Sequence, residues 1–124
     1  MFHLVNILLF LGFFTPNQPE PVNAVIGDES FIAKFQTTPA AGTPEDLRIA
    51  THLEYVEMLQ RADVHHLQPE QRKNREFLLD QLREYRLRGE FPKNYAYAGR
   101  RPCFIDKDGN ICAVGYLVEV TAGR

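Results

Sequence analysis

Residues 43–89 read TPEDLRIATHLEYVEMLQRADVHHLQPEQRKNREFLLDQLREYRLRG, and this stretch carries the start and stop signals of two helices. Thr43 is a suitable cap, Pro44 suits the first helical position, and the acidic pair that follows favours the positive end of the helix dipole. Apolar residues then recur at spacings of three and four, at Leu47, Ala50, Leu53, Val56 and Leu59 or Gln60. The pattern predicts an amphipathic helix to about Ala62.

A second helix is predicted from Pro69 to the residue before Gly89. Gly89 is well placed as the left-handed residue that ends it, and Pro92 prevents an immediate restart. Its inner face is predicted to hold Leu78, Leu79, Leu82 and Tyr85. Because the connector between the two helices is short, they are expected to lie antiparallel as a helical hairpin.

Residues 1–24 predict a cleaved secretory signal peptide. The apolar run from Leu4 to Phe14 is too short to span a bilayer as a helix but fits the apolar region of a signal. Val22-Asn23-Ala24 resembles a signal-peptidase site, so we expect cleavage between Ala24 and Val25 and a secreted or periplasmic protein with no stable membrane span. No Lys or Arg precedes the apolar run, which leaves an uncleaved anchor or a buried N-terminal strand as alternatives.

The rest of the chain is expected to form one small domain. Residues 25–42 are predicted to be an N-terminal extension, with a short strand around Phe31 to Thr37 and a linker. Residues 43–124 are predicted to hold the helical hairpin and the cysteine-containing segment. The fold class expected is small α+β, with the hairpin packed on a hairpin-like turn segment and the start of a C-terminal helix between Phe104 and Val118; a mostly α fold is the alternative.

The charge distribution argues against a general attraction to nucleic acid, because the net charge of the chain is only −2. Residues 25–71 carry three basic and eight acidic side chains, whereas residues 72–101 carry nine basic and four acidic ones. Such a split can steer an anionic partner or draw two helices together within the fold. We expect the second.

Residues 101–120, RPCFIDKDGNICAVGYLVEV, resemble a calcium loop at their start, since Asp106, Asp108 and Asn110 occupy alternate positions. The later glycine and carboxylate of an EF-hand loop are missing. The same residues suit a tight turn in which Gly109 supplies the positive φ. We therefore expect a turn and no metal or other cofactor.

The two cysteines in this segment allow two readings. In an exported domain Cys103 and Cys112 are expected to pair, if Asp106 to Gly109 form a four-residue loop that sets them opposite each other. If Asp108-Gly109 is a two-residue loop instead, Cys112 faces Ile105 and the sulfurs separate.

Alternatively, Asn110 caps a helix that starts near Cys112, and the helix dipole favours the thiolate of a nucleophile there. The base would have to be His52, His65 or His66, and no spacing places any of them beside Cys112. An inert core cysteine is the simpler interpretation. The adjacent pair His65-His66 lacks a supporting ligand spacing, so no zinc site is predicted.

The segment EFPKNYAYAGRRP, residues 90–102, is irregular and combines aromatic with basic side chains. Tyr95, Tyr97, Arg100 and Arg101 are the candidate binding residues, because loops of this composition contact partners as well as closing small cores.

Three strings together resemble a group of uncharacterised exported bacterial proteins: HLEYVEML at 52–59, HLQPEQRKNREFLLDQLREYRLRGEFPKN at 66–94 and RRPCFIDKDGNICAVGYLVEVTAG at 100–123. The resemblance implies that the segment like CAVGYL begins a helix followed by further chain, so that the chain is expected to be a fragment ending at Arg124. It also implies that position 103 need not be cysteine, and it implies no activity.

The sequence therefore predicts an exported, non-enzymatic binding or structural domain whose partner is a protein or a small ligand. A thiol-dependent hydrolase or redox protein that uses Cys112 is the alternative.

Overall fold

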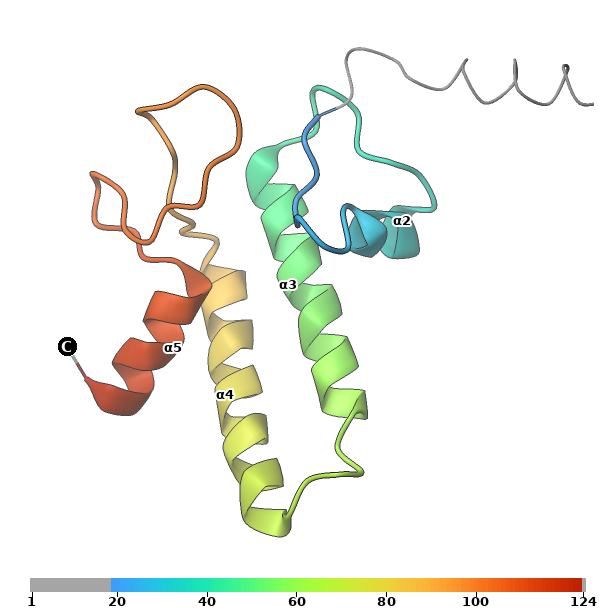
Figure 1. Ribbon diagram of the computed structural model, residues 1–124, viewed down its shortest axis with the longest axis vertical. Coiled ribbons are helices and arrows are strands. Elements are labelled where there is room, and N and C mark those ends of the chain that lie inside the picture. Colours follow the sequence, from blue (N-terminus) through green and yellow to red (C-terminus); the bar gives the residue numbers. More distant parts are fainter. Residues whose placement is uncertain (1–18, 124) are drawn as a thin grey trace, which may run out of the picture.

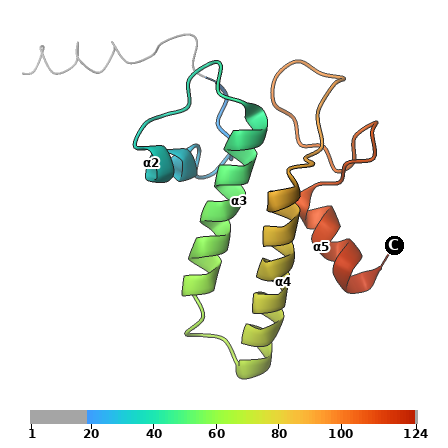
Figure 2. The same ribbon diagram turned by 180° about the vertical axis from the view of Figure 1, so that it is seen from behind.

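The computed structural model describes residues 19–123, so the apolar part of the predicted signal lies outside the described residues. Four helices occur in this range: α2 (Glu29–Phe35), α3 (Glu45–Ala62), α4 (Pro69–Arg88) and α5 (Ala113–Ala122). Helices α3 and α4 form an antiparallel hairpin, α2 packs against the outer side of α3, and α5 packs against α4 (Figures 1 and 2).

The fold is mostly α, and the predicted α+β class is wrong. No sheet forms among residues 19–123, where pairing is limited to two isolated bridges, Asn23 with Gly27 and Ile105 with Ile111. The segment predicted as hairpin-like makes only the second bridge, because the chain turns into α5 directly after Cys112. The apolar residues after Cys112 therefore form a helix rather than a second strand.

The strand predicted around Phe31 to Thr37 is also wrong, since this part of the chain is helix α2. Asp28 and Glu29 place negative charge at the start of the helix, and Gln36 ends it in the left-handed conformation. Phe31 and Phe35, four residues apart, come together on one face with ring centroids 4.5 Å apart. A spacing of four residues places two side chains on the same face of a helix, and the segment lacks the polar–apolar alternation of a strand.

The limits of α4 are confirmed. Pro69 is its first residue, and Gly89 ends it with φ of 68°. Gln68 and Gln71 form a reciprocal capping box at its start. Leu79, Leu82 and Tyr85 are buried as predicted, whereas Leu78 is only partly buried.

The buried face of α3 differs from the predicted apolar stripe. Leu47 and Leu59 are exposed, and the buried positions are Arg48, Thr51 and Glu57. Pro44, expected inside the helix, instead occupies the cap position. Arg48 is buried because it donates to Glu20 and Asp28 of the N-terminal segment. Glu57 is buried against α4, where it pairs with Arg86.

The core is small and centred on the C-terminal half of α4. Leu79, Leu82, Tyr85 and Phe91 are its buried members, and partly buried residues of α3 and α5 pack on it, namely Ile49, Ala50, Leu53, Ala113, Tyr116 and Leu117. The Tyr85 ring stacks on Tyr116 at 5.3 Å and lies 5.6 Å from Phe91. The aromatic end of the core therefore joins α4, α5 and the loop after α4.

Ion pairs add to the contact between α3 and α4. Buried Glu57 accepts from Arg86 at 3.1 Å, as the split of charge along the sequence predicts. Arg61 pairs with Asp80 at 2.8 Å, and in this pair the basic residue lies on α3 and the acidic one on α4. Among residues 19–123, none of the helices combines the length and apolar character needed to cross a bilayer.

Candidate functional site

A cleft of about 890 Å³ lies at the end of the hairpin where α3 begins and α4 ends. One wall is the first turns of α3, and the opposite wall is the loop from Pro92 to Cys103. Tyr85, Phe91, Cys112 and Ala113 line it from the core side, and Glu20 enters it from the N-terminal segment. The cleft thus joins three parts of the chain that are distant in sequence.

The loop that forms one wall is held in shape by Asn94. Its amide nitrogen donates to the carbonyl oxygens of Tyr97 and Gly99 at 3.0 and 3.1 Å, while its amide oxygen accepts from the N–H groups of Ala96 and Tyr97. One side chain therefore satisfies four backbone groups of a loop without secondary structure. Sequence reasoning did not single out Asn94, although Asn near Gly is the residue type that such turns favour.

Asp106 ties the next turn to this wall. Its buried carboxylate accepts from the N–H groups of Lys93, Asp108 and Asn110 and from the amide of Asn110, at 2.9 to 3.0 Å. Gly109, with φ of 85°, closes the turn, so the turn predicted for Asp106, Asp108 and Asn110 is found. Within the described part of the chain, no group of three or more potential metal ligands occurs.

We expect acid to loosen this turn. Burial alone raises the pKa of Asp106, but the hydrogen bonds from Asn110, Lys93 and Asp108 outweigh it and hold the pKa below its usual value. The contribution to stability is therefore present above the unfolded pKa of about 3.9 and is lost as the pH falls below it. The protection of the Lys93 and Asn110 amides against exchange should fall below about pH 4 more than the protection of amides within α4.

A pair of variants checks the same contacts at neutral pH. Asp106→Ala should speed exchange at both amides, whereas Asp108→Ala, which removes an exposed carboxylate from the same turn, should not. Equal exchange rates in the two variants would contradict the role given to Asp106.

Neither predicted register of the cysteine segment is found. Ile105 pairs with Ile111, and the Cys112 N–H donates to the Phe104 carbonyl at 2.8 Å, so the loop runs from Asp106 to Asn110. Cys112 is therefore opposite Phe104, one residue away from Cys103. Both cysteines are free thiols in the structure, and both line the cleft. The predicted bridge is not formed.

Cys112 is itself the cap residue of α5, whereas it was expected in the first turn of a helix capped by Asn110. Its sulfur accepts from the Gly115 N–H at 3.4 Å, and Asn110 does not cap the helix. On the core side, Tyr85 donates its hydroxyl hydrogen to the Ile111 carbonyl at 2.7 Å. Burial, together with the nearby Cys112, raises the pKa of Tyr85 to about 12, although Arg88 partly opposes this. Tyr85 therefore stays protonated and acts as a donor.

The structure brings none of the three expected base candidates into the cleft. His65 and His66 lie in the connector between α3 and α4, at the opposite end of the hairpin (Figure 1). His52 is half-buried on α3 and does not line the cleft. Burial and the charge of Arg100 lower the pKa of His52, against a smaller effect of Asp28, so its imidazole is neutral at neutral pH.

The four predicted binding residues divide into two groups. Arg100 and Arg101 line the cleft, whereas Tyr95 and Tyr97 do not and are 58% and 63% exposed. The Arg101 guanidinium lies over the Tyr97 ring at 4.5 Å, and Lys107 lies over the Tyr95 ring at 4.4 Å. Each exposed ring is therefore paired with a cation, and the Tyr97–Arg101 pair stands at the cleft rim.

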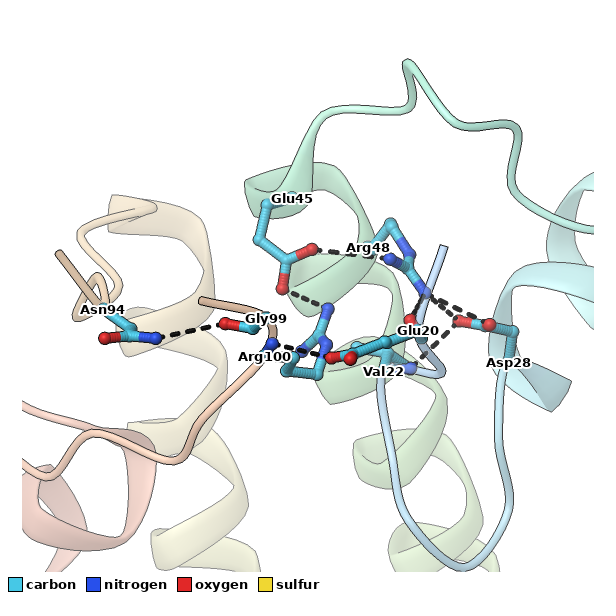
Figure 3. Close-up of polar contacts among 8 residues, drawn as sticks. All are labelled: Glu20, Val22, Asp28, Glu45, Arg48, Asn94, Gly99 and Arg100. Atoms are coloured by element: carbon cyan, nitrogen blue, oxygen red, sulfur yellow. Dashed lines mark hydrogen bonds and ion pairs between the residues drawn. The ribbon is translucent and has the colours of Figure 1, made fainter. Parts of the chain in front are cut away.

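Glu20 and Arg48 are site residues that sequence reasoning missed. The side chain of Arg48 is only 4% exposed and donates to Asp28 at 2.9 Å and to the Glu20 carbonyl at 2.6 Å. The Glu20 carboxylate accepts from the backbone N–H of Arg100 at 2.6 Å. Glu45 pairs with the guanidinium groups of Arg48 and Arg100 (Figure 3). Glu20 was overlooked because it belongs to the predicted signal, and Arg48 because it interrupts the apolar pattern.

Comparisons of the chain with protein families, with curated proteins and with solved structures found no match. The functional argument therefore depends on the cleft and on its residues.

Proposed function

We propose that the chain is an exported, non-enzymatic binding domain that holds its partner in the cleft and against the loop from Tyr95 to Arg101. The observation that carries the proposal is the placement of the Tyr97–Arg101 pair at the rim of a cleft of about 890 Å³. That volume lies within the range of ligand pockets. Exposed tyrosine and arginine side chains are the types that contribute most to binding energy at interfaces.

Export is proposed on the sequence of residues 1–24 alone. The apolar run, the polar stretch after it and the small residue at Ala24 support it. N-terminal sequencing of the protein from its source cells tests it, with Val25 as the expected first residue. A first residue of Met1, in material recovered from the cytosol, would contradict it.

The binding proposal is tested with three baits, each expressed with its signal and recovered in exported form: wild type, Tyr97→Ala/Arg101→Ala and Arg83→Ala. Arg83 is an exposed arginine on α4 away from the cleft and serves as the charge-matched control. We expect quantitative affinity purification from extracytoplasmic fractions to recover a partner with wild type and with the control. The double variant should recover at least about tenfold less, which corresponds to about 1.4 kcal/mol. Equal recovery by all three baits would contradict the proposal.

The thiol-dependent alternative has one observation in its favour, which is that both cysteines line the cleft and Cys112 caps a helix. Among the described residues that line the cleft, no histidine is present to act as a base for the sulfur. We therefore expect alkylation of Cys112 to be much slower at about pH 6 than at about pH 8, because the thiolate is the reacting form. Equal rates, measured by mass spectrometry with Cys103→Ser as background, would favour the thiol-dependent alternative.

A further inference from the structure

We propose that the cleft recognises an acidic residue of a peptide, and that Glu20 of the chain itself occupies this position until the N-terminal segment is removed. The proposal rests on the proposed function, since it names the chemistry of the partner that the cleft binds. It starts from the contacts of Glu20, which is a peptide residue seated in the cleft (Figure 3).

Both the side chain and the backbone of Glu20 are held. The carboxylate accepts from the Arg100 N–H at 2.6 Å, and the carbonyl oxygen accepts from the Arg48 guanidinium at 2.6 Å. Two donors from different parts of the fold thus contact the acid group and the main chain of the same residue. A free anion satisfies only the first contact, so the arrangement fits an acidic residue within a peptide.

The wall beside the carboxylate is shaped for close approach. Gly99 has φ of 76°, and a Cβ at this position would lie 3.1 Å from one carboxylate oxygen of Glu20 and 3.5 Å from the other. A side chain at residue 99 would therefore narrow the space that the acid group fills. The left-handed conformation of Gly99 also sets the direction of the adjacent Arg100 N–H.

The position that the Glu20 carboxylate fills is called the subsite. When Glu20 is absent, the side chains around the subsite carry one more positive charge than negative charge. Arg48, Arg100 and Arg101 are the guanidinium groups there. Asp28 and Glu45 are the carboxylates, and they pair with Arg48 and Arg100. The remaining charged neighbours, Lys93 and Asp46, pair with each other at 3.6 Å. Arg48 is nearly fully buried, and its Nε has no hydrogen-bond partner in the described structure. A buried guanidinium with unused donor capacity favours an anionic or carbonyl-bearing occupant.

Glu20 belongs to the same chain, so it competes with any free ligand. A short tether holds such a group at an effective concentration of about millimolar, which suppresses binding of ligands of similar intrinsic affinity. The predicted cleavage after Ala24 removes Glu20 and exposes the subsite. The precursor is thus closed by its own segment, and the processed chain is open.

The test uses the full chain with Glu20→Ala, because the fold of a chain starting at Val25 is a separate question. The probe is the blocked hexapeptide PEPVNA, residues 19–24, and its Gln form PQPVNA is the control peptide. Binding is followed through the Arg100 amide signal in two-dimensional NMR spectra. Glu84→Ala removes an exposed carboxylate of α4 outside the cleft and is the matched protein control.

We expect Glu20→Ala to bind PEPVNA at least about tenfold more tightly than wild type or Glu84→Ala, because the internal competitor is gone. PQPVNA should bind Glu20→Ala about tenfold more weakly than PEPVNA. Equal binding of the peptide by wild type and Glu20→Ala, equal binding of the two peptides, or no shift of Arg100 would each overturn the inference. Glu20→Gln keeps the shape of the segment and should also bind PEPVNA more tightly than wild type. If it does not, the Glu20→Ala result comes from unfolding of the segment and not from release of the subsite, and the inference fails.

Failure of this inference and failure of the proposed function are separable. If Tyr97→Ala/Arg101→Ala loses its partner but the peptide experiment fails, the cleft binds something other than an acidic peptide. If the peptide binds as expected but the double variant keeps its partner, the loop rim is not the contact surface.

Discussion

Tyr85→Ala is expected to lower the free energy of unfolding by about 3–5 kcal/mol. Tyr85 is only 3% exposed and contacts Phe91 and Tyr116, so its removal opens a cavity where three segments meet. A domain with so small a core has little stability in reserve. Urea unfolding followed by circular dichroism measures the change.

Tyr85→Phe separates the hydroxyl from the ring. It keeps the aromatic packing and leaves the Ile111 carbonyl without its 2.7 Å donor, at a cost of about 1–2 kcal/mol. Tyr55→Phe is the control, because the Tyr55 hydroxyl contacts an exposed carboxylate, and its stability should equal that of wild type. A Tyr85→Phe variant as stable as wild type would contradict the role of the hydroxyl in placing α5.

The raised pKa of Tyr85 adds a pH signature. Because the folded pKa of about 12 exceeds the unfolded value of about 10, the hydroxyl contributes stability that is complete below about pH 10. This contribution is lost as the pH rises through about 12. The stability difference between wild type and Tyr85→Phe should therefore shrink over this interval, and a constant difference would contradict it.

Arg48→Ala is expected to cost about 3–5 kcal/mol, because it leaves Asp28 as a largely buried carboxylate without its partner. It also removes the donor to the Glu20 carbonyl, so the N-terminal segment should lose its attachment to α3. Limited proteolysis should then cut near residues 20–28 faster than in wild type, in addition to the loss measured by urea unfolding.

Two further variants define the cause. Lys34→Ala breaks an ion pair whose side chains are 46% and 44% exposed, and should cost no more than about 1 kcal/mol. Arg48→Met/Asp28→Leu replaces the buried pair by apolar groups and should recover much of the loss. Full recovery of the proteolysis rate by the double variant would contradict a role of Arg48 in holding Glu20.

The parts of the fold that the sequence predicted are those set by local signals. Pro69 and Gly89 fix the limits of α4 through backbone geometry, and the spacing of its leucines fixes the inner face. Helix α2 was missed because its evidence is one short aromatic pair. The buried face of α3 was missed because burial of Arg48 and Glu57 depends on partners distant in sequence.

The candidate site was predicted in part, for the same reason. Arg100 and Arg101 do line a cleft, and the composition of their loop was the signal. The cysteine register was missed because the hydrogen bonds of Asp106 close a loop of a length that neither prediction considered. Glu20 had no local signal at all, since its position follows from contacts with Arg48 and the Arg100 N–H across the fold.

The contact between Glu20 and the Arg100 amide is the central claim, and two-dimensional NMR of Glu20→Gln in the full chain tests it most directly. The Arg100 amide signal should move strongly when the carboxylate becomes an amide, with smaller changes at Gly99, and Glu84→Gln should leave both signals in place. An Arg100 signal that is the same in wild type and Glu20→Gln would contradict the account, because the cleft would then not be closed by its own N-terminal segment.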